Sequence, residues 1–496
     1  MHISDVSEKR LRLIIYSFLL ITAVCLRWQA LGAPMINIDE EFYLFTGGRI
    51  LQGDLPFVDI WDRKPVGLFL LYAFFHLFGT WRILAYQIGA LLSVWGTAIL
   101  VWRMARTIAP AGGAVIAALL YEIWLILAGG EGGQSPVFYN LLTAAAMSCI
   151  ICFLPAIKKN DQFRRNMGIV VMLFLGLAIQ IKYTVIVEGI FAGLYLLWTG
   201  LRAKNSPRHL LADASVWIGC ALLPTCLSFL FYRAKGYGHA WWFANIKSIF
   251  LRGHMSHSQI ESITVVIIAI LIPLMLCWLI RKPLSIHFQG EQKEHIIFFN
   301  IWSVFALLSL FSLGSWYNHY TLPALLPLSI QAAPLWRKKT GQFLIIAIAC
   351  CGTVIGQRAL FRHFQQHANI IAFEEMQAAL SSPPGCIFIY DGPAILYDTP
   401  AYCKLTTHPF PSHFSSEIEK NATGMNPLKE ISSVLAQRPA HIVSTEPADA
   451  EENQSVRARL YETLSKDYTP TYQHHFRHHT TVIYTRNTLL SPAHSP

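Results

Sequence analysis

Acidic and basic side chains gather in one polar segment, residues 34–64, between two apolar stretches. Its first half contains three adjacent acids, Asp39, Glu40 and Glu41, and it ends with Arg63 and Lys64. A carboxylate can act as a general base or bind a metal ion, and a lysine or arginine can hold a phosphate. A solvated loop at a membrane surface would contain the same residue types, so the surrounding elements must decide between these interpretations.

Composition indicates what those elements are. Of 496 residues, 54% are hydrophobic and only 14% are charged, against about 25% charged residues in soluble domains. Charges are costly in hydrocarbon, so this deficit predicts a polytopic, mainly all-α membrane protein. The formal net charge is +10, but the Lys and Arg residues stand in short blocks between apolar stretches. That is the positive-inside pattern, and no nucleic-acid partner is expected.

The apolar stretches predict about eleven membrane-spanning helices, each needing about 20 residues. The stretch 167–200 is too long for one helix and is bounded by basic blocks, so it reads as a helical hairpin with Lys182 at its tip. The run 65–79 is too short to span and is expected to be interfacial or re-entrant. The remaining expected spans are 11–31, 82–102, 111–128, 136–155, 213–232, 260–280, 296–313, 320–336 and 342–360.

The basic blocks also set the orientation. All of the basic blocks can be cytoplasmic together only if the run 65–79 does not cross the membrane. This arrangement puts the N-terminus in the cytoplasm and the C-terminus outside the inner (plasma) membrane. Residues 1–360 then form a multi-pass domain with a first outer loop at 34–64. Residues 361–496 are expected to be a small soluble, periplasmic α/β domain, because short apolar runs at 386–390, 441–444 and 481–484 alternate with helix-like segments.

Further polar residues stand at the expected outer side. Glu131 lies in a run of four glycines, and His319 ends an expected outer helix. Either could serve a site, or be solvated and cap a helix. Cys386 and Cys403 could pair in an oxidising compartment, but their spacing does not decide this. The histidine-rich run 474–479 has no adjacent acid or thiol, which favours a surface strand or loop over a metal site.

Two sequence motifs, one in the segment 34–65 and one at 318–327, resemble those of a known family, the GT-C superfamily of glycosyltransferases. The similarity is to the branch of bacterial protein mannosyltransferase-like enzymes and lipid A aminoarabinose transferases. In that branch the first span is followed by an acidic pair, then an aromatic residue, glycines and a Lys-Pro step, and this chain has the same order. Some relatives have Pro-Pro in place of Lys-Pro. The residues are Asp39-Glu40, Tyr43, Gly47, Gly53, Asp54, Pro56, Lys64-Pro65 and, in a late motif, Asn318-His319-Tyr320, Leu322-Pro323 and Pro327.

The resemblance implies roles for individual residues. Asp39 matches the general base that activates the acceptor, and Glu40 its assisting neighbour. The donor phosphate would be bound by Lys64, Lys182 and Arg63. Contacts to the acceptor or the sugar are expected at Tyr43, Glu131, His319 and Tyr320.

The implied reaction is an inverting transfer of a hexose or pentose from a polyprenyl-phosphate donor to an acceptor hydroxyl on the outer face. Partners would be that donor and membrane lipids. The scheme requires no cofactor, although the Asp-Glu pair could hold a divalent cation. The sequence leaves open the sugar, the oligomeric state and the acceptor, which could be a protein, lipid A or its core, or a polysaccharide.

The alternative function is that of a lipid or sugar transporter or flippase. Such proteins often show repeats and broken spans, and this chain shows neither clearly.

Overall fold

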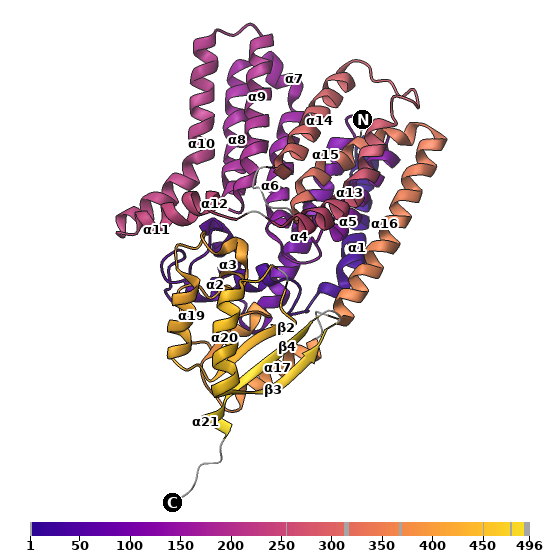
Figure 1. The fold of residues 1–496 in the computed structure, drawn as a ribbon. Helices are drawn as coiled ribbons and strands as arrows, with labels where there is room; N and C mark the ends of the chain where they lie inside the picture. Colours follow the sequence, from indigo (N-terminus) through magenta and orange to yellow (C-terminus); the bar gives the residue numbers. More distant parts are fainter. Residues whose placement is uncertain are drawn as a thin grey trace, which may run out of the picture. The chain divides into compact units, whose positions relative to one another are not determined.

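A computed structural model describes residues 2–253, 255–311, 317–366, 370–449, 451–476 and 479–490. The chain divides into two compact units (Figure 1). The first, here the transmembrane unit, comprises residues 1–31, 87–228 and 257–361. The second, here the loop–tail unit, comprises residues 32–86, 229–256 and 362–496.

Among the described residues, a helix lies over each of the eleven expected spans. Eight helical stretches are long and apolar enough to cross a membrane, and α5 is a shorter apolar helix. The predicted class of an all-α polytopic membrane protein is therefore confirmed. The helices are α1 His2–Arg27, α4 Arg82–Ala105, α5 Ala111–Leu127, α6 Ser135–Cys152, α8 Asp161–Ile179, α9 Ile186–Arg202, α10 Pro207–Ala234, α13 His257–Leu279, α14 Glu291–Leu308, α15 Leu322–Ala332 and α16 Lys339–Gln366.

Local sequence explains where the α8–α9 hairpin begins and turns (Figure 1). The Asn160 side chain accepts a hydrogen bond from the Phe163 N–H and caps α8, as an N-cap asparagine does. The chain leaves helical geometry at Lys182, which is extended, and re-enters through a 3-10 turn, Tyr183–Val185. Lys182 therefore stands at the turn between two apolar helices.

Contacts within the transmembrane unit place several basic loops at one end. Arg337 donates hydrogen bonds to the carbonyls of His287 at 2.9 Å and Ile108 at 2.8 Å. Lys158 pairs with Glu294 at 2.6 Å. Four loops distant in sequence thus meet at a single end, which agrees with the charge pattern.

The loop–tail unit begins with two packed helices, α2 Ile38–Leu51 and α3 Val66–His76. A Cβ atom on Gly47 would lie 2.5 Å from the Ala73 nitrogen and 2.6 Å from the Tyr72 carbonyl carbon. The two helices can therefore touch backbone to backbone only because residue 47 is glycine. The 11 residues of α3 span about 16 Å, too little to cross the roughly 30 Å of hydrocarbon. This is the short helix expected at 65–79.

The tail forms the expected α/β domain, with a four-stranded sheet in the order β1-β2-β4-β3. β1 pairs with β2 in parallel, and the other neighbours are antiparallel. Side chains of α19 and α20 join Phe388 and Ile442 in its core. The elements are α17 Ile370–Ser381, β1 Ile387–Ile389, α18 Ser412–Ser415, α19 Pro427–Ala436, β2 His441–Glu446, α20 Gln454–Asp467, β3 Tyr468–His475, β4 Thr480–Arg486 and α21 Asn487–Leu490.

Strand β3 was predicted only at its end, where the histidine-rich run was expected to be a surface strand or loop. It holds His474 and His475 of the histidine-rich run, whereas residues 477 and 478 of that run lie outside the described residues. Most of its side chains are exposed or half-exposed, so it lacks the apolar signal that marked the other strands.

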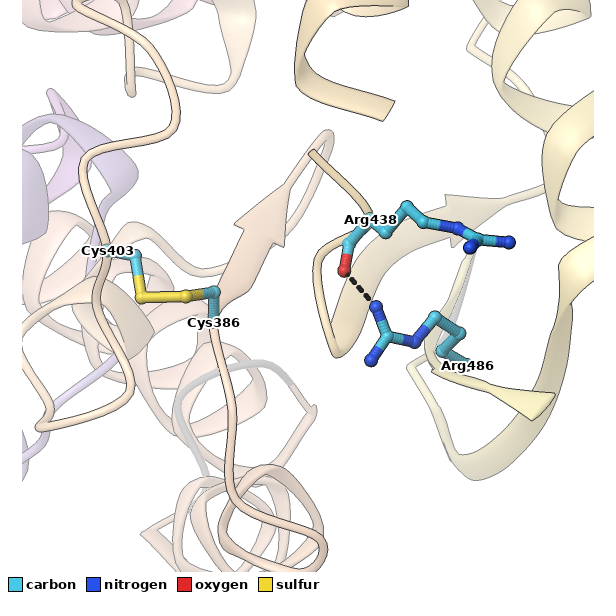
Figure 2. The surroundings of a disulfide bond; sticks show 4 residues. All are labelled: Cys386, Cys403, Arg438 and Arg486. Carbon is cyan, nitrogen blue, oxygen red and sulfur yellow. Dashed lines mark hydrogen bonds between the residues drawn. A yellow bond between two sulfur atoms is a disulfide. The ribbon is translucent and has the colours of Figure 1, made fainter. Parts of the chain in front are cut away.

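Cys386 and Cys403 form a disulfide with their Cα atoms 5.3 Å apart. Figure 2 shows the bond beside β1. Nearby, the Arg486 guanidinium donates a 2.6 Å hydrogen bond to the Arg438 carbonyl. The sequence had left this pairing open, and the structure resolves it.

Candidate functional site

The acidic residues of the first outer loop lie in the first turn of α2. Asn37 caps this helix, and its side chain accepts a hydrogen bond from the Asp39 N–H at 3.0 Å. Asp39, Glu40 and Glu41 follow Ile38, the first residue of the helix. A helix N-terminus carries partial positive charge, which stabilises carboxylates at this position.

Asp39 faces Lys64 across the loop. The Lys64 Nζ lies 3.8 Å from the Asp39 Oδ1, and the two side chains are 23% and 21% exposed. The same Nζ lies 5.4 Å from the centre of the Tyr43 ring. A turn fixes the direction of Lys64, because its N–H donates to the Asp62 side chain at 2.9 Å. An acid and a base thus meet at a position that a ligand could reach.

Glu40, the neighbour of Asp39, is only 1% exposed. On α3, burial raises the pKa of Tyr72 well above its ordinary value, and the negative charges of Glu40 and Asp39 raise it further. The Tyr72 and Tyr43 rings pack edge to face at 5.4 Å. The two acids that the sequence treats as a pair therefore have different surroundings.

Glu41 belongs to this region but was not among the predicted site residues. It is 4% exposed and accepts a hydrogen bond from the Ile395 N–H of the tail at 3.2 Å. Burial raises its pKa to about 8, against the lowering effect of backbone donors at Ile395 and Ala394. Nothing in the sequence separates it from Glu40, because its partner lies 354 residues away.

Arg63, expected at the donor phosphate, holds a carboxylate in this structure. Its Nη1 lies 2.8 Å from the Glu419 Oε1, and Nη2 binds the other oxygen. Arg252 also pairs with Glu419, at 2.9 Å. Neither Glu419 nor Arg252 was predicted as a site residue.

In the transmembrane unit, Lys182 and the late motif lie together. Lys182 is 6% exposed, and its Nζ lies 4.0 Å from the centre of the Tyr320 ring. The His319 ring packs edge to face on Tyr320 at 4.8 Å. A desolvated ammonium over an aromatic face is a favourable cation–π arrangement.

The glycine-rich loop that carries Glu131 is fixed from two sides. Arg27, only 2% exposed, donates hydrogen bonds to the carbonyls of Gly130 and Gly132. Gly129 has φ +76°, and a Cβ there would lie 2.9 Å from the Asn318 side chain. Within the described part of the chain, the buried Glu131 Oε2 has no hydrogen-bond partner. Gly129, two residues before Glu131, thus lies against Asn318 of the late motif.

The structure therefore gathers the predicted residues into two groups. Asp39, Tyr43 and Lys64 lie together in the loop–tail unit, and Lys182, His319 and Tyr320 lie together in the transmembrane unit. Each group is described within its own unit. The described residues contain no cluster of three or more His, Cys, Asp or Glu residues placed to hold a metal ion.

Residues 62–229, about a third of the chain, match the sequence model of the family described as dolichyl-phosphate-mannose-protein mannosyltransferase. This match begins after Asp39 and Glu40. No curated protein matches the sequence at a significant level.

Solved structures resemble nearly the whole chain. ArnT from Cupriavidus metallidurans, solved with undecaprenyl phosphate, has a TM-score of 0.53 and 14% identity, covering 97% of this chain and 99% of its own. The Archaeoglobus fulgidus oligosaccharyltransferase, tethered to an acceptor peptide, has a TM-score of 0.53 and 11% identity, covering 98% of this chain and 75% of its own. The oligosaccharyltransferase AglB from Archaeoglobus fulgidus, solved with an inhibitory peptide and a dolichol-phosphate, and an Archaeoglobus fulgidus oligosaccharyltransferase in complex with Zn and sulfate are also similar.

These findings confirm the resemblance drawn from the sequence. The chain has the fold of the polytopic GT-C glycosyltransferases, and residues 62–229 carry the mannosyltransferase match.

Proposed function

We propose that the protein is an inverting glycosyltransferase that moves a sugar from a polyprenyl-phosphate donor to an acceptor hydroxyl on the outer face of the inner membrane. The observation that carries the proposal is the half-exposed Asp39–Lys64 pair at 3.8 Å. It offers one group that can take a proton and one that can stabilise a leaving phosphate.

In this scheme the acceptor oxygen attacks the anomeric carbon from the face opposite the phosphate. The bond between that carbon and the phosphate oxygen breaks, and the configuration inverts. The acceptor proton passes to Asp39, because a hydroxyl is a poor nucleophile without a base within hydrogen-bond reach. Lys64 stabilises the negative charge on the departing polyprenyl phosphate.

The other predicted residues complete the scheme. Lys182 and Arg63 add positive charge for the donor phosphate, and Glu40 orients Asp39. Tyr43, Glu131, His319 and Tyr320 contact the sugar or the acceptor. Among the residues that the structure describes, no group satisfies the buried Glu131 Oε2, which supports this role because a buried polar atom without a partner costs free energy unless a ligand satisfies it.

Three observations support the donor class and the location. ArnT was solved with undecaprenyl phosphate and AglB with a dolichol-phosphate, both lipid-linked phosphates. The basic blocks favour a cytoplasmic N-terminus. The Cys386–Cys403 disulfide in the tail is expected in an oxidising compartment such as the periplasm.

The scheme uses lysine and arginine charges and requires no metal ion. Asp39 and Glu40 could nevertheless hold a divalent cation, so transfer should be assayed with and without a chelator. Full activity in the chelator is expected. A loss that added Mg²⁺ or Mn²⁺ restores would assign the acidic pair to a cation.

The first test does not require knowledge of the sugar, because every such donor releases the same kind of product. Binding of undecaprenyl phosphate to the purified protein can be measured by native mass spectrometry. Wild type is expected to bind, Lys64→Ala to lose about tenfold or more in affinity because a charge-assisted contact is removed, and Asp39→Asn to bind normally. Asp39→Asn should keep the fold and abolish transfer.

Absence of binding to folded wild-type protein would contradict the proposed donor and favour a transporter. Transfer at the wild-type rate by Asp39→Asn would contradict the general-base role alone.

A further inference from the structure

We infer that Glu419, in the C-terminal tail, is a positioning residue that holds the cationic side of the donor-phosphate site through Arg63 and Arg252. The inference rests on the proposed function, and it gives the tail a role in the reaction beyond that of an attached domain.

Glu419 joins three segments of the loop–tail unit that are far apart in sequence. It is 5% exposed, and its two oxygens bind the two terminal nitrogens of Arg63. Arg252, from the segment 229–256, pairs with the same carboxylate at 2.9 Å. The arginine side chains are only 14% and 16% exposed. Two guanidinium groups thus share one buried acid.

The carboxylate remains charged in this setting. Burial alone would raise the pKa of Glu419, but the hydrogen bond from Arg63 and the charges of Arg63, Arg252 and Lys64 lower it below its usual value. Lys64 is therefore close enough to contribute to the same electrostatic field. Arg63 and Arg252 together carry one positive charge more than Glu419 neutralises, and that charge is available to an anion, whereas Lys64 is paired with Asp39.

The tail also fixes Trp61, two residues before Arg63. The Trp61 N–H donates to the Thr407 carbonyl at 2.7 Å. The Trp61 ring stacks on His408 at 5.2 Å and meets the His413 ring at 4.8 Å. Because Trp61 and Arg63 are both held, the turn that aims Lys64 at Asp39 has little freedom.

Arg252 is fixed by the residue that precedes Glu419. The Gly253 N–H donates to the Ile418 carbonyl at 2.8 Å, and a Cβ on Gly253 would lie 3.2 Å from the Ile418 Cα. Ile418 therefore binds the backbone of Gly253, and Glu419 binds the side chain of Arg252. Without the carboxylate, two poorly solvated guanidinium groups would face each other and move apart. Cations that are already in place bind a phosphate without reorganisation.

The test compares Glu419→Gln and Glu419→Ala with Glu417→Gln in the full-length protein. Glu417 is a suitable control because it lies in the same short helix, Glu417–Glu419, and its side chain forms an exposed pair with Lys420. Affinity for undecaprenyl phosphate is measured by native mass spectrometry, and thermal unfolding confirms the fold. Both Glu419 variants should lose roughly 10- to 100-fold in affinity, as when a residue that orients a ligand-binding group is removed, and Glu417→Gln should match wild type.

A double variant separates positioning from loss of structure. If Glu419 acts through Arg252, then Glu419→Ala combined with Arg252→Ala should bind no more weakly than the weaker single variant. Additive losses, wild-type affinity in folded Glu419 variants, or an equal loss in Glu417→Gln would each overturn the inference. These results differ from failure of the proposed function, in which wild type itself would not bind the lipid phosphate.

Discussion

Asp39 and Glu40 differ only in their position on α2, yet they have different surroundings. The Asp39 side chain is 21% exposed and faces Lys64, whereas Glu40 is 1% exposed and lies against α3. The sequence identified both acids, because their types and order suffice for that. It could not assign them different surroundings, because burial depends on which residues of α3 pack against α2.

Glu41 gives a prediction about pH. Its pKa is raised by burial from 4.5 to about 8 in the folded protein, so the folded state retains a proton that the unfolded state releases above pH 4.5. Stability contributed by this residue is therefore present at low pH and is lost as the pH rises towards 8, by on the order of 4 kcal/mol.

Glu41→Gln removes this titration while keeping a side-chain oxygen for the Ile395 N–H. Thermal unfolding in detergent should show similar stability of wild type and variant near pH 4.5 and a stability gap in favour of the variant that widens up to pH 8. A gap that stays constant with pH would contradict the raised pKa. Glu417→Gln, at an exposed position, serves as the control.

At the scale of elements, the apolar runs predicted the helices well because lipid-facing helices must be long and uncharged. The pairing of α2 with α3 was less visible. Its signal was Gly47-Gly48, where the His76 ring and the α3 backbone occupy the space that side chains would need. The first part of strand β3, residues 468–473, was missed because its exposed polar residues show no buried face. The packing of α2 on α3 and the formation of β3 both depend on contacts with other elements, and the local sequence does not show these contacts.

The close packing of α2 on α3 makes Gly47 sensitive to a single methyl group. In Gly47→Ala the new Cβ would lie 2.5 Å from the Ala73 nitrogen, so the helices must separate. A loss of about 1–3 kcal/mol in unfolding free energy is expected from such overpacking. Binding of undecaprenyl phosphate should weaken as well, because the Tyr43–Tyr72 contact spans the same helix pair.

Gly219→Ala in α10 is the matched control, since a Cβ there would have no atom within 4 Å. Both variants are compared by thermal unfolding and by lipid-phosphate binding. Equal behaviour of the two variants would show that the α2–α3 contact is not as close as described.

At the scale of the molecule, the sequence predicted a membrane region followed by a soluble tail. It did not indicate that residues 32–86 and 229–256 join that tail in one compact unit. The joining contacts, such as Ile395 to Glu41 and Arg63 to Glu419, connect residues 354 and 356 positions apart. Such pairs cannot be inferred from local periodicity, because any acid in the tail could have been the partner of Arg63.

The disulfide makes the predicted orientation of the whole chain measurable. Cys386 and Cys403 pair in the tail, and all eight free cysteines belong to residues 25–351. Intact spheroplasts are treated with a membrane-impermeant reductant and then with a maleimide-linked polymer. A periplasmic tail should gain two labels without permeabilisation, and a variant with both tail cysteines changed to serine should gain none. Labels that appear only after permeabilisation would place the tail in the cytoplasm. Acceptor transfer on the outer face would then be ruled out, because Arg63, the neighbour of Lys64, is bound by Glu419 of that tail.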